Sequence, residues 1–136
     1  MKTFLHPLQN LAEMEAIYTK AKSNRGILEI SGCMESQKAH LIYGLSGLFP
    51  SHLILSEDEK SAKELYEDYR FYDKNVYYYP AKDMLFFQAD IHGNLLIRQR
   101  MRVIKALLEQ KESITVITSV DGCLDYLQAF PFEKVE

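Results

Sequence analysis

The chain has 136 residues, 47% of them hydrophobic and 26% charged, a balance that excludes a disordered or fibrous protein and fits one globular domain. Its net charge of −3 excludes a general attraction to nucleic acid, and its two cysteines, Cys33 and Cys123, form neither a disulfide framework nor a C-x-x-C metal site. No stretch approaches the roughly 20 apolar residues that span a bilayer, so we expect a cytoplasmic protein that does not contact a membrane.

The first part of the chain predicts two helices separated by a short strand. Residues 7–22 carry apolar side chains at spacings of three and four, which predicts an amphipathic helix. Ile27–Ile30 is a β-prone run, and we expect a strand near residues 27–31 followed by a loop. A second helical pattern covers residues 36–48 and cannot continue through Pro50.

The next segments predict a strand and a well-marked helix. Leu53–Leu55 is apolar and β-prone, so we expect a strand near residues 53–56. Ser56 and Glu59 have the spacing of a capping box, which predicts that Ser56 caps the helix. One face of this helix is apolar and carries Ala62, Leu65, Tyr66 and Tyr69.

The last third predicts two further strands around a long helix. Val76–Tyr79 is β-prone and stops at Pro80. A helix is expected over residues 93–110, with a core face made of Ile97, Met101, Ile104 and Leu108. Ile114–Thr118 is the clearest strand, because three of its five residues are β-branched aliphatics, and residues 119–128 are expected to turn back into a helix.

Strands that alternate with helices predict βαβ units and therefore a mostly parallel sheet with helices on both faces. The expected fold class is α/β, with a single domain over residues 1–136. In such sheets ligands lie beyond the carboxyl ends of the strands. The loops to search therefore begin at Ser31, Ser56, Pro80 and Ser119.

Residues 32–39 lie where a G-x-x-x-x-G-K-[ST] phosphate loop would follow the first strand, which favours a three-layer P-loop-like domain. Gly32 and Lys38 match this pattern, whereas Gln37 replaces the second glycine and Ala39 replaces the hydroxyl that ligates magnesium. Glu35 would also repel a triphosphate. We expect no nucleotide here, and at most a simple anion held by Gly32, Ser36, Gln37, Lys38 and Ala39. Two matches also arise by chance, in which case Gly32 is a turn glycine and Lys38 a solvated lysine.

Four basic residues lie on the predicted long helix, and helical spacing places Arg98, Arg102 and Lys105 on one face and Arg100 elsewhere. This face predicts either contact with a DNA backbone in an intact larger protein or a solvated surface, and one of the four is open to pairing with an acidic residue. The sequence lacks an apolar strand ending in Asp-Glu and a G-x-S-x-G elbow, and its four histidines lack metal-ligand spacing. We therefore expect no catalytic residue and no metal site.

Several segments, taken in order, resemble domain 1a of bacterial transcription-repair coupling factors (Mfd), which is similar to the first domain of UvrB. Val76–Leu85 is similar to the family's FPAWETLPYD stretch, although Lys82 stands where the family often has tryptophan. The other segments that carry the resemblance are the loop Ile30–Ala39, the helix Glu64–Arg70, the helix Arg98–Leu108 and the strand and turn Ile114–Val120.

The resemblance implies that the chain is a fragment of a larger multidomain protein, an ATP-dependent DNA translocase that displaces stalled RNA polymerase and recruits UvrA. It implies that ATP and magnesium serve motor domains elsewhere in that protein. The fragment itself would then be a non-catalytic N-terminal scaffold domain. A small P-loop nucleotide-binding protein or NTPase remains the alternative.

Overall fold

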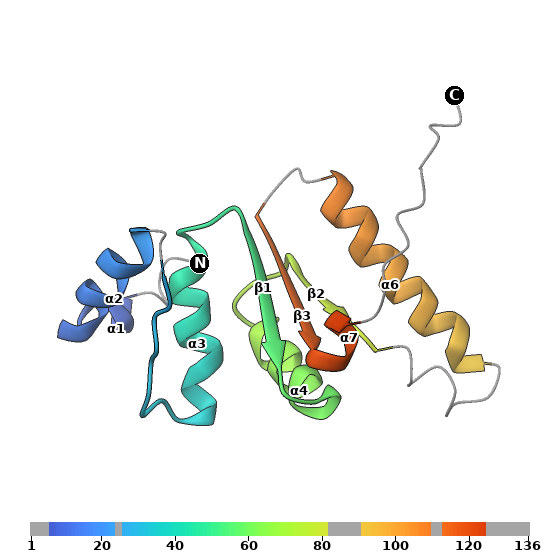
Figure 1. Cartoon of the computed structure of the whole chain (residues 1–136), viewed down its shortest axis with the longest axis horizontal. Helices are drawn as coiled ribbons and strands as arrows, with labels where there is room; N and C mark the ends of the chain where they lie inside the picture. Colours follow the sequence, from blue (N-terminus) through green and yellow to red (C-terminus); the bar gives the residue numbers. More distant parts are fainter. Residues whose placement is uncertain (1–5, 24–25, 82–90, 110–112, 125–136) are drawn as a thin grey trace.

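Three strands, β1 (Ser51–Ser56), β2 (Val76–Tyr79) and β3 (Ile114–Ser119), form a sheet with the order β1-β3-β2 (Figure 1). Both pairings are parallel, with Leu53 opposite Val116 and Tyr77 opposite the same residue on the other side. The structure is a computed structural model that describes residues 6–23, 26–81, 91–109 and 113–124. The predicted α/β fold class with a parallel sheet is confirmed.

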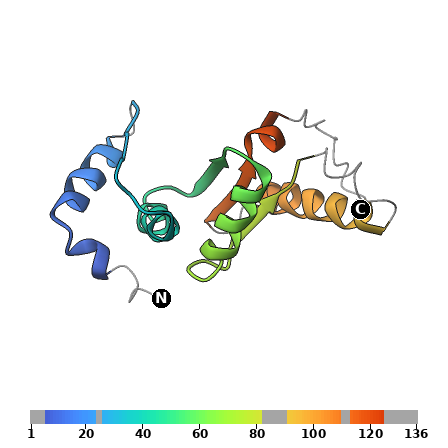
Figure 2. The same ribbon diagram turned by 90° about the horizontal axis from the view of Figure 1, so that it is seen from below.

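Helices α4 (Glu59–Tyr69) and α6 (Ile91–Glu109) cover opposite faces of the sheet (Figure 2). All six residues of β3 are buried, because side chains of a central strand alternate between two apolar layers. On the α4 face, Ile117 packs in a buried cluster with Ala39, Ala62, Tyr69 and Val76. On the α6 face, Val116 packs with Tyr79 and Val103.

The predicted apolar face of α4 is confirmed, whereas its predicted cap is wrong. Ala62 and Tyr69 are fully buried, and the other two apolar residues of that face pack against the same cluster. The cap is Asp58 rather than Ser56, and its carboxylate accepts a hydrogen bond from the Ser61 amide at 2.7 Å. This bond lowers the pKa of Asp58 and satisfies an otherwise unpaired helix amide. The carboxylate of the next residue, Glu59, instead accepts hydrogen bonds from residues at the edge of the sheet.

Three further helices lie at one end of the molecule, and the single N-terminal helix predicted is two: α1 (His6–Gln9) and α2 (Ala12–Lys22). The break falls at Asn10, a poor helix former, and at Leu11, whose backbone is extended. Helix α3 (Glu35–Ser46) agrees with the predicted second helix to within two residues at each end.

The predicted strand over residues 27–31 is wrong, because the structure has no strand there. Gly26 and Gly32 have φ angles of 98° and 79°, and these left-handed residues turn the chain at the two ends of the segment. The Ile27 side chain is 93% exposed, and the segment runs on the far side of α3 from β1 (Figure 1). A β-prone run becomes a strand only when it pairs with a neighbour, and α3 separates this run from the edge of the sheet.

The predicted core face of α6 is also wrong. Val103 is 2% exposed and Arg100 is 8% exposed, whereas three of the four predicted core residues, Ile97, Met101 and Leu108, are more than 40% exposed. One residue step turns a helix by about 100°, so the face that contacts the sheet is rotated from the one the apolar pattern indicates. The rotation is consistent with the buried hydrogen bond that the Arg100 guanidinium donates to the Pro80 carbonyl at 2.9 Å, because this bond turns the Arg100 side of the helix toward the sheet.

Within the described residues, the structure contains no helix both long enough and apolar enough to cross a membrane. The predictions for residues 82–85, 110 and 125–128 lie outside the described residues.

Candidate functional site

The predicted phosphate loop lacks the strand that should precede it, and its key side chains do not converge. Lys38 Nζ donates to Glu35 Oε1 at 2.5 Å, and this hydrogen bond raises the pKa of Lys38. The Gln37 amide oxygen accepts from the Met34 backbone amide at 3.3 Å, so it helps to start α3. Ala39 is buried in the core, where no ligand reaches it. The lysine is thus neutralised by its own helix.

Two of the predicted anion-binding residues stay at the surface of this segment. Gly32 has open space where a side chain would be, so its left-handed φ alone explains the glycine. Ser36 is exposed on the first turn of α3. The arrangement leaves an exposed helix start with an acidic residue in its first turn, which disfavours an anion.

Glu59 gathers three hydrogen bonds at the carboxyl edge of the sheet. Its Oε1 atom accepts from the Ala81 amide at 3.1 Å and from the Ser119 hydroxyl, and its Oε2 atom accepts from the Tyr78 hydroxyl. Tyr78 lies in β2, Ser119 ends β3 and Ala81 follows β2 by two residues, whereas Glu59 is the first residue of α4. One carboxylate therefore joins a helix to two strands at the edge where parallel sheets usually bind ligands.

The groups around Glu59 are themselves held in place. Burial, and then the hydrogen bond and the charge of Glu59, raise the pKa of Tyr78 well above its usual range, so this hydroxyl stays protonated and donates. The Ser119 hydroxyl oxygen accepts from the Gly122 amide at 3.0 Å. A side chain at Gly122 would place its Cβ 2.4 Å from the Thr118 hydroxyl, so only glycine fits there. The edge is a closed hydrogen-bond network rather than an open pocket.

The sequence signalled Glu59 only as half of a capping box. Its donors are 19, 22 and 60 residues away along the chain, so no local pattern links them. Three of the loops predicted to hold ligands begin at this edge, at Ser56, Pro80 and Ser119. The loop after Ser31 does not join them, because the sheet lacks the predicted first strand.

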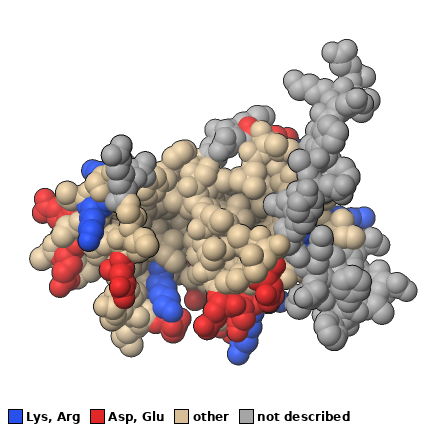
Figure 3. Space-filling model, viewed as in Figure 1, with Lys and Arg blue, Asp and Glu red and all other residues tan. Residues whose placement is uncertain are grey.

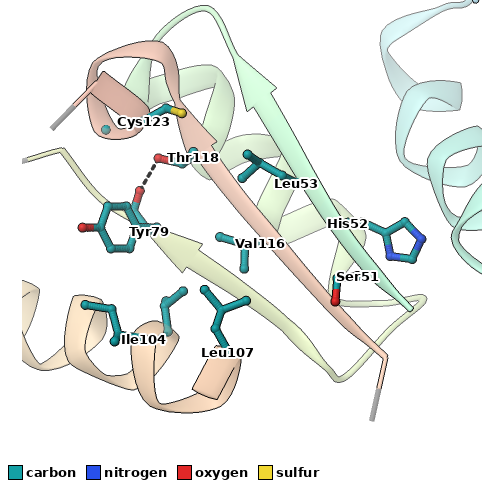
Figure 4. Close-up of a pocket in the computed structure, with 11 residues that line it drawn as sticks. Ser51, His52, Leu53, Tyr79, Ile104, Leu107, Val116, Thr118 and Cys123 are labelled. Atoms are coloured by element: carbon teal, nitrogen blue, oxygen red, sulfur yellow. Dashed lines mark hydrogen bonds between the residues drawn. The ribbon is translucent and has the colours of Figure 1, made fainter. Parts of the chain in front are cut away.

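An apolar hollow of about 350 Å³, which we call the trough, lies between α6 and the part of the sheet that includes β1 (Figure 4). Helix α7 (Val120–Leu124) stands at one end of it. Its lining includes Leu53, Tyr79, Ile104, Leu107, Val116 and Cys123. Its volume is at the low end of the range for small-molecule sites, and the Thr118 hydroxyl at its wall donates to the Tyr79 carbonyl at 2.7 Å. The trough therefore offers apolar surface and few groups to orient a polar ligand.

The basic residues of α6 divide as their spacing predicted. Arg98, Arg102 and Lys105 are exposed, and Lys105 lies 3.8 Å from Glu109, an acidic partner on the same helix. Arg100 points elsewhere, with its guanidinium 4.4 Å from the centre of the Tyr79 ring. The partners found for this buried arginine are thus a carbonyl and an aromatic face.

A shallow polar groove beside β2 brings Arg102 close to Lys74, and it holds about 210 Å³. Across the face drawn in Figure 3, by contrast, acidic side chains gather over α4 and basic ones are scattered. Contact with a DNA backbone through Arg98, Arg102 and Lys105 therefore stays a prediction that rests on one helix. The described residues contain no group of three or more His, Cys, Asp or Glu side chains able to hold a metal.

Comparisons of the chain with protein-family models, with curated proteins and with solved structures find no match. The resemblance to coupling factors therefore rests on the sequence segments that carry it.

Removing the Glu59 carboxylate should loosen the whole carboxyl edge. We expect Glu59→Ala to lower the free energy of unfolding by about 3 kcal/mol, because it leaves three donors without their acceptor, and Glu59→Gln to cost less. Urea unfolding measures the loss. Glu64→Ala on the same helix is the control, because its pair with Lys60 is 3.9 Å long and solvent-exposed and should contribute less than about 0.5 kcal/mol. Equal losses in the two variants would contradict the role of Glu59.

Proposed function

We propose that this chain is a non-catalytic scaffold domain of a transcription-repair coupling factor, built on a three-layer P-loop-like plan. The observation that carries the proposal is the closed carboxyl edge. In a working α/β enzyme this edge binds the ligand, whereas here the Glu59 carboxylate fills it and accepts from three groups of the protein itself. A carboxylate engaged in this way holds the fold together rather than serving a substrate.

The state of the degenerate phosphate loop supports the same proposal. Lys38 is paired with Glu35, and Ala39 is buried. Neither the lysine nor a hydroxyl is available where phosphates and magnesium would need them. No described feature favours the alternative, a small nucleotide-binding protein or NTPase.

In the proposed setting the complete protein is a cytoplasmic, ATP-driven DNA translocase that displaces stalled RNA polymerase and recruits UvrA. ATP and magnesium act in its motor domains, and this chain positions the module that recruits UvrA. The exposed basic side of α6, with Arg98, Arg102 and Lys105, is the part of the chain proposed to approach DNA.

Nucleotide titration distinguishes the proposed scaffold domain from the alternative, an NTPase. We expect magnesium-ATP to give no binding heat and no phosphate release with the native chain. Gln37→Gly combined with Ala39→Ser should improve phosphate binding without turnover if residues 32–39 are an eroded loop; serine is chosen because position 39 is buried. Adding Lys38→Ala is the control and should remove any gain. Turnover by the native chain would exclude the scaffold function.

Binding to purified UvrA tests the coupling-factor assignment. Calorimetry should detect weak binding or none with residues 1–136 alone, because the resemblance places the main UvrA contact in the module that follows. A longer chain that includes this module should bind. Micromolar binding by residues 1–136 would show that this domain carries the contact itself, and no binding by the longer chain would contradict the assignment.

A further inference from the structure

The polar groove beside β2 follows the outer edge of the sheet. Its lining includes Tyr66 of α4 and Arg102 of α6, and these two helices cover opposite faces of the sheet (Figure 2). Tyr77 and Tyr78 line it as well, although the first packs on the α6 face of the sheet and the second on the α4 face. A hollow that touches both faces passes beside an edge strand, and β2 is an edge strand in the order β1-β3-β2.

The backbone of β2 directs polar groups outward along this edge. The Thr115 amide of β3 donates to the Asn75 carbonyl at 3.0 Å, so the Asn75 carbonyl faces β3. In a parallel pair, alternate residues face the same neighbour, which turns Tyr77 toward β3 and turns Val76 and Tyr78 away from it. Among the described strands, none pairs with β2 on its outer side. The outward N–H and C=O groups of Val76 and Tyr78 therefore offer a short row of donors and acceptors to a further strand.

The charged side chains in the described lining of the groove are basic. Lys74 and Arg102 both line it, and no described acidic residue forms an ion pair with either of them. Acidic residues close to them in the sequence or the fold have other partners. Asp73 accepts a hydrogen bond at 2.9 Å from the backbone amide two residues further on, and Glu67 pairs with Arg70 at 3.0 Å. The groove therefore favours a ligand that carries negative charge.

The groove and the strand edge together favour an extended acidic peptide over a simple anion or DNA. A phosphate group only accepts hydrogen bonds, so it would meet the two basic side chains and leave the outward carbonyls of Val76 and Tyr78 unused. A peptide backbone supplies both donors and acceptors. Strand β2 has only four residues, so the backbone bonds of an added strand are few and charge has to supply part of the affinity.

We propose that the outer edge of β2 binds an extended acidic peptide as an added strand. The peptide backbone pairs with Val76 and Tyr78, and its carboxylates bind Lys74 and Arg102. Lys105 lies on the same basic side of α6 as Arg102 but is not among the described residues that line the groove, so it takes no part. The inference does not depend on the proposed function, because none of its steps uses UvrA, DNA or RNA polymerase.

The first test is a titration of the full chain with a fluorescent, end-blocked peptide of alternating glutamate and threonine, about eight residues long, within the usual range for a strand. Lys74→Gln and Arg102→Gln should each weaken binding about fivefold, as expected for loss of one solvent-exposed charge pair. Lys105→Gln is the matched control and should change the affinity by less than about twofold, because its partner Glu109 lies outside the groove. All three positions are exposed, so urea midpoints should stay equal to that of the native chain.

The second test is hydrogen exchange at the amides of β2, which a merely electrostatic contact would not change. At a peptide concentration about ten times its Kd, the Val76 and Tyr78 amides should exchange about tenfold more slowly. The Tyr77 amide already faces β3 and should keep its rate. This alternation along the strand is the signature of an added strand.

Several outcomes would overturn the proposal. The native chain could fail to bind the peptide, or the affinity could fall as much in Lys105→Gln as in Arg102→Gln, which would indicate a general attraction of charge. Peptide binding that leaves the Val76 and Tyr78 amides unprotected would show that the groove holds an anion only. A DNA duplex that binds where the peptide does not, with equal losses in Arg102→Gln and Lys105→Gln, would support the DNA contact of the proposed function and exclude the added strand.

Discussion

The hydrogen bonds of one carboxylate hold the carboxyl edge of this fold together. Glu59 starts α4, yet its two oxygens accept from the ends of β2 and β3, so the helix and both strands are fixed at a common point. The position is favourable because the first turn of a helix attracts negative charge and Asp58 already satisfies the cap. The end of β3, the close turn at Gly122 and the chain at Ala81 are all linked to this carboxylate by hydrogen bonds, the turn through the Ser119 hydroxyl.

The same constraint bears on function. A parallel sheet offers ligands its carboxyl edge, and this chain uses that edge to stabilise itself. The phosphate-loop residues are equally committed, with Lys38 bound to Glu35 and Ala39 in the core. These two facts are what support a scaffold over an NTPase. On the other face of the sheet, the trough is lined mainly by apolar side chains of the described residues.

Much of the fold was predictable from local sequence. The predictions that were wrong depend on contacts between residues far apart in the chain. The strand at Ile114–Ser119 and the apolar face of α4 follow from β-branched residues and helical spacing. The run Ile27–Ile30 has the same local signal but no neighbouring strand. The orientation of α6 depends on Arg100 reaching a carbonyl 20 residues away, which no periodicity reveals. The Glu59 network was hidden for the same reason, since its donors come from other elements.

Hydrogen exchange at the Ala81 amide tests the central claim most directly. Ala81 is the last described residue after β2, and its amide donates to Glu59 Oε1 at 3.1 Å. If Glu59 closes the edge, the amide should exchange as slowly as those of β3, through global unfolding, and Glu59→Gln should speed its exchange more than theirs. An Ala81 amide that exchanges as fast as an unprotected loop in the native chain would contradict the account.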